Sequence, residues 1–244
     1  MATDAPRVLV SLATYNERDN LAPLVDEIAA FAPQADVLVI DDNSPDGTGA
    51  LADDLAAKDP RIHVMHRAGK LGLGTAILAG MRYAMENGYE MLVNMDADFS
   101  HHPRYLPALL AGMQTHDVMI GSRYVEGGGA LHWPLARRWM SRGVNTVARM
   151  LMRIPAQDTS GGFRCYAVPL LRRANLTRLL SKGYSFQQEI LYCCRRAGAR
   201  IGEIPIIFEN RRAGASKVNP HEAARSMAVI LYIGLRATFG FDRN

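Results

Sequence analysis

Short apolar runs alternate with longer segments of helical periodicity in the first half of the chain. The segment from residue 16 to residue 31, for example, places Leu21, Leu24, Val25 and Ile28 on one helical face. Strands that are apolar throughout, with helices between them, are typical of a parallel sheet covered on both faces. We therefore expect an α/β fold with a mostly parallel central sheet. The predicted strands are residues 7–13, 36–40, 62–66, 91–95 and 117–121, and the predicted helices are residues 16–31, 49–57, 75–87 and 103–115.

The pattern changes after Ser122, but no linker or internal repeat separates the two halves. A glycine run at residues 127–129 precedes a predicted helix over residues 134–152. Residues 158–164 predict a tight turn that leads into a strand. A helix over residues 186–197 and a strand over residues 200–207 complete this half, and we expect both halves to share one core.

The C-terminal segment, residues 220–241, is apolar almost all round between Met227 and Leu235. This apolar stretch is too short to cross a bilayer, which takes about 20 residues. Two interpretations stay open: a helix packed into the core, or a helix that lies on a membrane surface.

A polar cluster follows each of the first four predicted strands. Because the carboxyl ends of parallel strands meet at one edge of a sheet, these clusters are expected to converge on one crevice. The clusters are residues 14–18, 41–48, 67–74 and 96–98.

Asp96-Ala97-Asp98 closes the fourth of these strands and carries the clearest chemistry. Side chains two apart on an extended chain point the same way, so both carboxylates could face one divalent ion. A hard cation held by one or two carboxylates keeps positions open for phosphate oxygens. The alternative is an ordinary loop, since Asp-x-Asp is common in loops. Ser100, His101 or water could supply a further metal ligand.

The other strand ends carry residues suited to a nucleotide. Asp41 and Asp42 could hydrogen-bond a base or a ribose, although Ser44-Pro45-Asp46-Gly47 also has the chemistry of a capped turn. Lys70 stands beside glycines that let the backbone approach a diphosphate. The segment Lys70-Leu71-Gly72-Leu73-Gly74 is neither a complete dinucleotide fingerprint nor a P-loop, so a Rossmann dehydrogenase is poorly supported.

Composition narrows the ligands further. The chain has 244 residues, a net charge of +4 and only four lysines among 28 basic residues. Arginine favours phosphate contacts, although a genome-wide preference for arginine codons also explains such an excess. Aromatic residues for base stacking are not interleaved with the arginine pairs, so phosphorylated ligands or a membrane surface rank above nucleic acid. Cys165, Cys193 and Cys194 fit neither a disulfide framework nor a zinc site and are interpreted as reduced packing residues.

The ordered motifs resemble family 2 glycosyltransferases, and more narrowly the polyprenol-phosphate (dolichol-phosphate) mannose synthases. The resemblance rests on Ala13-Thr14-Tyr15-Asn16-Glu17, on Asp41-Asp42-Asn43-Ser44-Pro45-Asp46-Gly47-Thr48 and on Asp96-Ala97-Asp98. It continues through Gly121-Ser122-Arg123-Tyr124, Thr159-Ser160-Gly161-Gly162-Phe163-Arg164, the run around Gln187 and Glu189, and Arg212-Ala213-Gly214-Ala215-Ser216-Lys217. It implies a GT-A fold, a nucleotide-sugar donor, Mg²⁺ or Mn²⁺, and a lipid phosphate acceptor.

The resemblance also implies residue roles and an organisation of the chain. Residues 1–122 would bind the nucleotide sugar, residues 123–219 the acceptor, and residues 220–244 would form a terminal helix able to associate with membrane. Asp96 and Asp98 would hold the metal, and Arg123, Arg138 and Ser141 the acceptor phosphate. Asp98, Arg123 and Arg138 would act in catalysis. The donor-binding set would be Thr14, Tyr15, Glu17, Asp41, Asp42, Asp46, Lys70, Asp96, Arg212 and Lys217.

The activity expected from this resemblance is inverting transfer of mannose from GDP-mannose to a polyprenyl phosphate. Alternatives are a UDP-sugar donor such as UDP-glucose, and a nucleotide-sugar-binding subunit without turnover. Ala13 replaces the proline usual before Thr-Tyr-Asn-Glu, and the chain looks like a short form without transmembrane helices. We expect a cytoplasmic protein, peripheral at the membrane, which reaches its acceptor through the terminal helix, the loop at residues 125–133 or a membrane-anchoring partner protein.

Overall fold

A seven-stranded sheet forms the centre of the part of the chain that the structure describes. The structure is a computed structural model that describes residues 6–176, 179–181, 183, 185–209 and 220–239, with the side chains of the last helix described from 226 to 236. The strand order is β3-β2-β1-β4-β7-β5-β8, and β7 is antiparallel to both of its neighbours. The sheet strands are β1 (Val8–Thr14), β2 (Ala35–Asp41), β3 (Ile62–His66), β4 (Met91–Asp96), β5 (Val118–Ser122), β7 (Arg164–Ala167) and β8 (Ile201–Pro205).

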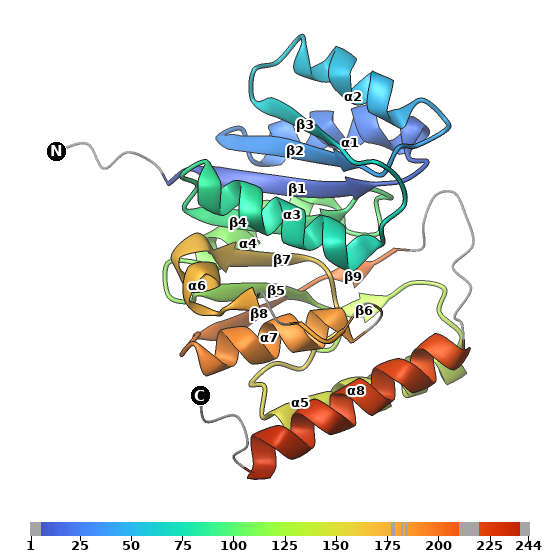
Figure 1. Cartoon of the computed structure of the whole chain (residues 1–244), viewed down its shortest axis with the longest axis vertical. Helices are drawn as coiled ribbons and strands as arrows, with labels where there is room; N and C mark the ends of the chain where they lie inside the picture. The colour runs from blue at the N-terminus through green and yellow to red at the C-terminus, as the bar shows by residue number, and fades with distance from the viewer. Residues whose placement is uncertain (1–5, 177–178, 182, 184, 210–219, 240–244) are drawn as a thin grey trace, which may run out of the picture.

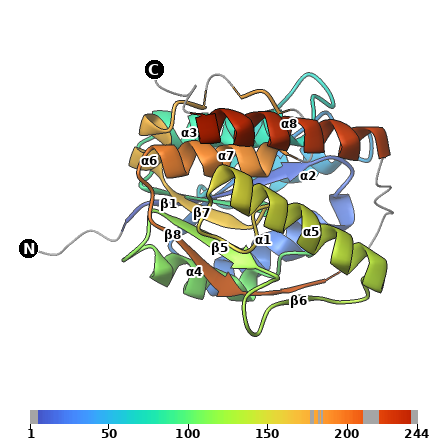
Figure 2. The ribbon, with the colours of Figure 1, turned by 90° about the horizontal axis from the view of Figure 1, so that it is seen from below.

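Helices cover both faces of this sheet, as the α/β prediction requires (Figures 1 and 2). One face carries α1 (Arg18–Phe31), α2 (Thr48–Ala56), the 3₁₀ turn η1 (Pro103–Tyr105) and α4 (Leu106–Gly112). The other carries α3 (Leu73–Glu86), α6 (Val168–Arg173) and α7 (Phe186–Arg196), with α5 (Leu135–Met152) and α8 (Pro220–Phe239) packed beyond them. The short strands β6 (Gly129–Ala130) and β9 (Ile207–Phe208) pair with each other outside the main sheet.

Alternating strand residues fill two separate core layers. In β2, Leu38 and Ile40 face the α3 and α7 side, while Val37 and Val39 face the α1 and α4 side, and all four are buried. Both layers are apolar, which explains why the strands appear in the sequence as continuous apolar runs rather than alternating ones. The mostly parallel sheet with helices on both faces is therefore confirmed.

The strand register aligns the polar strand ends at one edge. Thr14 at the end of β1 pairs with Asp41 of β2, and Ala13 pairs with Asp96 of β4. The chain leaves β1 toward β2 and β3 and then returns to its other side at β4. This change of direction opens a crevice beyond the strand ends, which is where doubly wound folds bind ligands.

Local geometry corrects some of the predicted element boundaries. The first helix begins at Arg18 rather than at residue 16, because Asn16 has a φ of 62° that a helix does not accommodate, so Glu17 precedes the helix instead of lying inside it. The predicted helix at residue 103 begins as a 3₁₀ turn. The sequence reading missed α6 and the short strands β6 and β9.

The remaining packing predictions concern the cysteines and the terminal helix. Cys165 and Cys194 are buried, Cys193 is partly buried, and all three are free, as predicted for packing residues. The helix α8 buries Ile230 and Ile233 in the core and leaves Leu231, Tyr232 and Leu235 exposed. One face of α8 thus packs into the core, and the exposed face could contact another surface.

Replacing Gly80 with alanine tests the close contact between α3 and the sheet. A β-carbon at Gly80 would collide with the buried Ser11 hydroxyl of β1 and approach Ile40. We expect Gly80→Ala to lower the free energy of unfolding by about 1–3 kcal/mol through overpacking, despite the better helix propensity of alanine. Gly143→Ala in α5 is the matched control, because no atom lies within 4 Å of its added β-carbon. Chemical denaturation should show the control unchanged or more stable, and a Gly80→Ala protein as stable as the parent would contradict this packing.

Candidate active site

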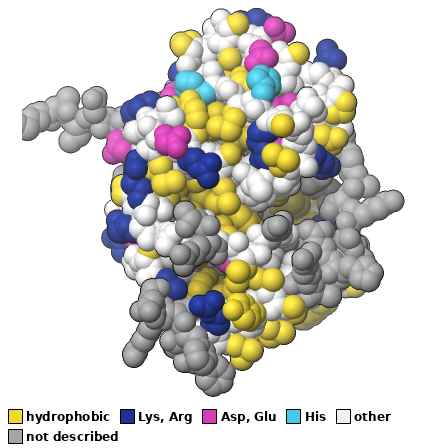
Figure 3. Space-filling model, in the orientation of Figure 1, with side chains coloured by type: hydrophobic (Ala, Val, Ile, Leu, Met, Phe, Trp, Pro, Cys, Tyr) yellow, Lys and Arg dark blue, Asp and Glu magenta, His cyan; other side chains and the backbone are white. Residues whose placement is uncertain are grey.

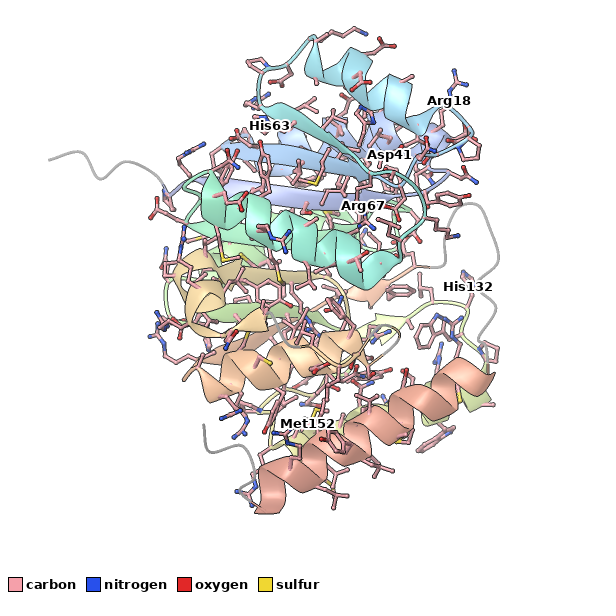
Figure 4. All side chains as sticks on the ribbon, viewed as in Figure 1. Arg18, Asp41, His63, Arg67, His132 and Met152 are labelled. Atoms are coloured by element: carbon pink, nitrogen blue, oxygen red, sulfur yellow. The ribbon has the colours of Figure 1, made fainter. Side chains whose placement is uncertain are left out.

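A cavity of about 220 Å³ lies at the carboxyl edge of the sheet, between the ends of β1 and β4. Figure 4 shows Asp41 and Arg67 near this end of the sheet and His63 toward the other end. Residues from all four predicted polar clusters line the cavity, so the convergence expected from the strand pattern is confirmed. The polar lining residues are Thr14, Tyr15, Glu17, Asp42, Lys70, Asp96 and Asp98.

Asp96 and Asp98 place two carboxylates in this cavity. The Asp96 side chain is 30% exposed, whereas Asp98 is almost fully buried. The backbone N–H of Ser100 donates to Asp98 Oδ1 at 3.0 Å. Phe99, between them in sequence, has a φ of 61°, an uncommon conformation for a bulky residue that turns the chain sharply after Asp98.

The donor atoms of this pair fit a hard divalent cation. Carboxylate oxygens are the ligands that Mg²⁺ and Mn²⁺ prefer. In the described residues no group of three or more His, Cys, Asp or Glu side chains could enclose a metal ion. The pair therefore suits an ion that takes part of its coordination shell from a bound ligand and water.

His101 supports the end of β4. Its Nδ1 accepts a hydrogen bond from the backbone N–H of Asp96 at 3.2 Å, and its ring stacks on Phe163 at 5.3 Å between ring centroids. Burial lowers the pKa of His101 below its ordinary value, although the carboxylates of Asp96 and Asp98 oppose this shift. A neutral ring with Nδ1 unprotonated fits the observed hydrogen bond.

Two charged contacts shape the side of the cavity formed by the loops after β1, β2 and β3. Asp42 lies 2.9 Å from Arg67 Nε and accepts from the backbone N–H of Leu71 at 3.2 Å, which fixes the loop before α3. Lys70 Nζ lies 4.1 Å from the centre of the Tyr15 ring. Sequence reasoning did not identify Arg67 as a separate site residue. Its position directly after β3 is the signal that could have identified it.

Asp41 and Asp46 hold the loop between β2 and α2 together. Asp41 accepts hydrogen bonds from the Thr14 hydroxyl at 3.0 Å and from the backbone N–H of Ser44 at 3.0 Å. Asp46 accepts from the backbone N–H groups of Thr48 and Arg18. Both carboxylates therefore have structural partners, and direct donor contacts for them stay a prediction.

After β5, a buried ion pair holds Arg123. Its Nε and Nη2 donate to the two carboxylate oxygens of Asp158 at 2.7 Å each, and Nη2 also donates to Ser160. Burial raises the pKa of a carboxylate, but the charge and hydrogen bonds of Arg123 outweigh it and hold the pKa of Asp158 below its ordinary value. The guanidinium is thereby fixed in one orientation.

Asn145 connects this ion pair to α5. Its Oδ1 accepts from the backbone N–H groups of Thr159 and Ser160, and its Nδ2 donates to the Ser160 hydroxyl and the Ser141 carbonyl. The Tyr124 hydroxyl donates to the Ser141 hydroxyl at 2.6 Å. The structure thus brings Arg123 and Ser141 into one network, whose organising residues Asp158 and Asn145 sequence reasoning did not identify.

Among the described residues, one predicted acceptor residue, Arg138, lies apart from this network. Arg138 is exposed on α5, where its Nη2 donates to the Ala130 carbonyl at 3.0 Å. Arg212 and Lys217 lie outside the described residues.

Fold and site together define a GT-A glycosyltransferase. Residues 10–174 match the family described as Glycosyl transferase family 2, and the chain belongs to this family. It is 42% identical over 231 residues to an undecaprenyl-phosphate mannosyltransferase of Micrococcus luteus, and the aligned residues cover 95% of each chain. It is 43% identical over 232 residues to a polyprenol monophosphomannose synthase of Mycolicibacterium smegmatis, which covers 94% of this chain and 88% of that one.

Solved structures share the fold at lower identity. A glucosyl-3-phosphoglycerate synthase from Mycobacterium tuberculosis, in complex with Mn²⁺ and UDP-glucose, superposes with a TM-score of 0.64 at 19% identity, covering 96% of this chain and 80% of that chain. A mannosyltransferase from Pyrobaculum calidifontis, in complex with GDP-Man and Mn²⁺, superposes with a TM-score of 0.59 at 18% identity, covering 96% and 74%. At these identities the likeness shows the fold alone.

Removing the charge of Asp158 tests the buried ion pair. Asp158→Asn would leave the Arg123 guanidinium buried without a counter-charge, and we expect a loss of about 3–5 kcal/mol in the free energy of unfolding. Asp117→Asn is the matched control, because Asp117 pairs with Arg200, whose side chain is 64% exposed, and solvent screens that pair. Chemical denaturation compares the two variants. If both substitutions lower the free energy of unfolding equally, the buried Arg123–Asp158 pair is no more important for stability than the exposed pair.

Proposed function

We propose that this protein transfers mannose from GDP-mannose to a polyprenyl phosphate with inversion, releasing GDP and polyprenyl phosphate mannose. The observation that carries the proposal is the identity above 40%, over almost the whole chain, to two relatives named for this transfer. The site geometry is consistent with it, because the cavity places two carboxylates suited to a divalent ion beside residues suited to a nucleotide. The buried Arg123, held by Asp158, offers a separate fixed charge for an acceptor phosphate.

On the donor side, Asp96 and Asp98 would hold Mg²⁺ or Mn²⁺, and the donor diphosphate would complete the coordination. The cation would stabilise the negative charge that develops on the departing diphosphate. Mn²⁺ accompanies the nucleotide sugar in both structural relatives described above, which supports a divalent ion in this role.

The nucleotide would lie against the β1 and β2 strand ends. Tyr15 and Lys70 form one wall of the cavity, Asp42 reaches a base or ribose, and Glu17 lies beside the first strand end. Thr14, Asp41 and Asp46 would shape the surrounding loops. Arg212 and Lys217 are proposed to reach the donor phosphates from the segment outside the described residues.

On the acceptor side, Arg123, Arg138 and Ser141 would receive the polyprenyl phosphate, and Asp98, Arg123 and Arg138 would act in catalysis. A phosphate oxygen attacks the anomeric carbon, the bond from that carbon to the diphosphate oxygen breaks, and its electron pair leaves with GDP. The attacking phosphate is already anionic near neutral pH, so it needs no strong general base. Asp158 keeps Arg123 aligned for this attack.

The acceptor lies in a membrane, and α5 offers a surface to meet it. In the part of the chain that the structure describes, no helix has both the length and the apolar character that a bilayer crossing requires. On α5, Leu135, Trp139 and Met150 are more than 60% exposed, and Arg137, Arg138, Arg142 and Arg149 lie on the same helix. Exposed apolar side chains among arginines suit a helix that lies in an anionic membrane surface. Figure 3 shows further hydrophobic side chains over α8, where Leu231, Tyr232 and Leu235 are exposed.

A panel of donors tests the proposed reaction. Purified protein with Mn²⁺ and a short polyprenyl phosphate should give polyprenyl phosphate mannose from GDP-mannose, identified by mass, and little product from UDP-glucose. Asp98→Ala should lower kcat/KM at least about 100-fold, because the departing diphosphate loses charge stabilisation. Asp54→Ala, which removes an exposed carboxylate on α2, is the matched control.

The same panel separates the alternatives. Product from UDP-glucose in place of GDP-mannose would support the UDP-sugar transferase. Donor binding without product from any donor would support a non-catalytic subunit. Full activity of a folded Asp98→Ala protein would contradict the metal-site assignment.

Vesicle flotation tests membrane docking through α5. We expect the parent protein to float with vesicles of phosphatidylglycerol and phosphatidylcholine. The double variant Leu135→Glu/Trp139→Glu should bind them at least about 10-fold more weakly, because it replaces two large apolar side chains that would transfer from water into the membrane. Phe31→Glu, at an exposed aromatic residue on α1 across the sheet, is the control. If the parent floats only when a second protein is added, a membrane-anchoring partner is required instead.

A further inference from the structure

Gln187 is a buried polar residue near Asp96, and the transfer reaction described above assigns it no role. It is the second residue of α7 and is only 8% exposed. Its side-chain oxygen Oε1 is fully buried and has no hydrogen-bond partner among the described residues. Buried polar atoms in native proteins are nearly always paired, so an unpaired acceptor at a ligand site indicates a partner that arrives with the ligand.

Two contacts hold the first turn of α7, which carries Gln187, in place. The Arg164 guanidinium donates to the Gln187 carbonyl and to the Thr159 carbonyl, at 2.7 Å in each case. Phe186, the residue before it, packs against Gly74 at the start of α3, where a β-carbon would lie 3.0 Å from the Phe186 ring. The first turn of α7 is therefore anchored to the acceptor-side turn and to the donor-side loop. Figures 1 and 2 show α7 lying between α3 and α5.

The side chain of Gln187 reaches toward the metal-type carboxylate. A β-carbon added at Gly162 would lie 3.5 Å from Gln187 Nε2 and 3.7 Å from Asp96 Oδ1. The amide of Gln187 and the carboxylate of Asp96 thus flank one point, which glycine leaves open. Asp158 connects this turn to Arg123. Its Oδ1 accepts one hydrogen bond from the backbone N–H of Gly161 and another from Arg123 Nη2.

This location corresponds to the transferred sugar. The sugar must be bonded to the diphosphate at Asp96 and Asp98 while its anomeric carbon faces the phosphate at Arg123, so it occupies the space between them. The unpaired Gln187 atom is Oε1, which shares its terminal carbon with the Nε2 that faces Gly162, and this acceptor needs a hydrogen-bond donor. Neither phosphate supplies one near neutral pH, and the hydroxyls and base of the nucleoside lie at the β1 and β2 ends. Sugar hydroxyls are the hydrogen-bond donors that remain among the proposed substrates.

We propose that Gln187 binds a hydroxyl group of the transferred hexose and thereby selects the donor sugar. This inference rests on the proposed function, because it takes the sugar to lie between the two phosphates. A site built to pair with a substrate hydroxyl discriminates strongly against an analogue that lacks the hydroxyl. Gln187 therefore acts on the choice of sugar rather than on the choice of nucleotide.

Gln187→Ala separates sugar recognition from nucleotide and metal binding. Calorimetry with Mn²⁺ should give the same Kd for GDP in variant and parent, within about two-fold, because GDP carries no sugar. With GDP-mannose and polyprenyl phosphate, kcat/KM should fall about 10- to 100-fold, as expected when a substrate hydroxyl loses its partner. Gln114→Ala, at an exposed glutamine after α4, should behave as the parent.

Deoxy donors identify the hydroxyl and provide a second readout. Among GDP-mannose analogues that lack a single hydroxyl, one should be a poor donor for the parent and an equally poor donor for Gln187→Ala, since both changes remove the same hydrogen bond. For each remaining analogue, kcat/KM relative to GDP-mannose should fall by the same factor in the parent and in the variant. If every analogue loses the same factor with parent and variant, Gln187 does not bind a sugar hydroxyl.

Stability and metal binding complete the test. Without ligand, the Tm of Gln187→Met, which keeps the side-chain volume, should equal or exceed that of the parent, because this variant removes an unpaired buried oxygen and no side-chain hydrogen bond. A clear fall in Tm would mark Gln187 as structural, and weaker binding of both GDP and Mn²⁺ would mark it as a metal ligand. Both results overturn the inference. A parent protein that transfers no mannose overturns the proposed function itself, whereas an active parent with an unaffected Gln187→Ala variant overturns only the role of Gln187.

Discussion

The parallel pairing of β1 with both β2 and β4 is the constraint on which the rest of the structure depends. Parallel strands in register end at the same edge, so Thr14, Asp41 and Asp96 are brought level by backbone hydrogen bonds alone. The apolar residues of these strands are buried on both faces, which makes a slip in register costly. The cavity exists because the chain changes direction at β1.

The proposed acceptor side depends on a different kind of interaction. There the antiparallel strand β7 begins after a turn in which Asp158 holds Arg123 and Asn145 holds the backbone of Thr159 and Ser160. A buried pair of charges contributes little net stability, but it fixes the guanidinium in one geometry. The hydrogen-bonded sheet edge thus positions the proposed donor side, and a buried polar network positions the proposed acceptor side.

Beside Asp96 the structure places the amide of Gln187 and the imidazole of His101. In the proposed reaction an anionic phosphate nucleophile needs orientation more than proton removal, so neither group has to act as a strong base. Glu189, the acidic residue of the first turn of α7, accepts hydrogen bonds from the backbone N–H groups of Leu180 and Ser181. It therefore serves to hold the preceding loop.

The sequence by itself determined the sheet, the polar clusters at its strand ends and the family, because strand periodicity and motifs such as Asp96-Ala97-Asp98 are local in the chain. Only the tertiary structure decided that β7 enters antiparallel, that Arg123 is paired with Asp158, and that Asp41 and Asp46 have loop partners. It also placed Gln187 beside Asp96, although 91 positions separate the two residues in the sequence. Such relations are made by contacts between distant segments, and the free energy of these contacts depends on burial and orientation that no local pattern encodes.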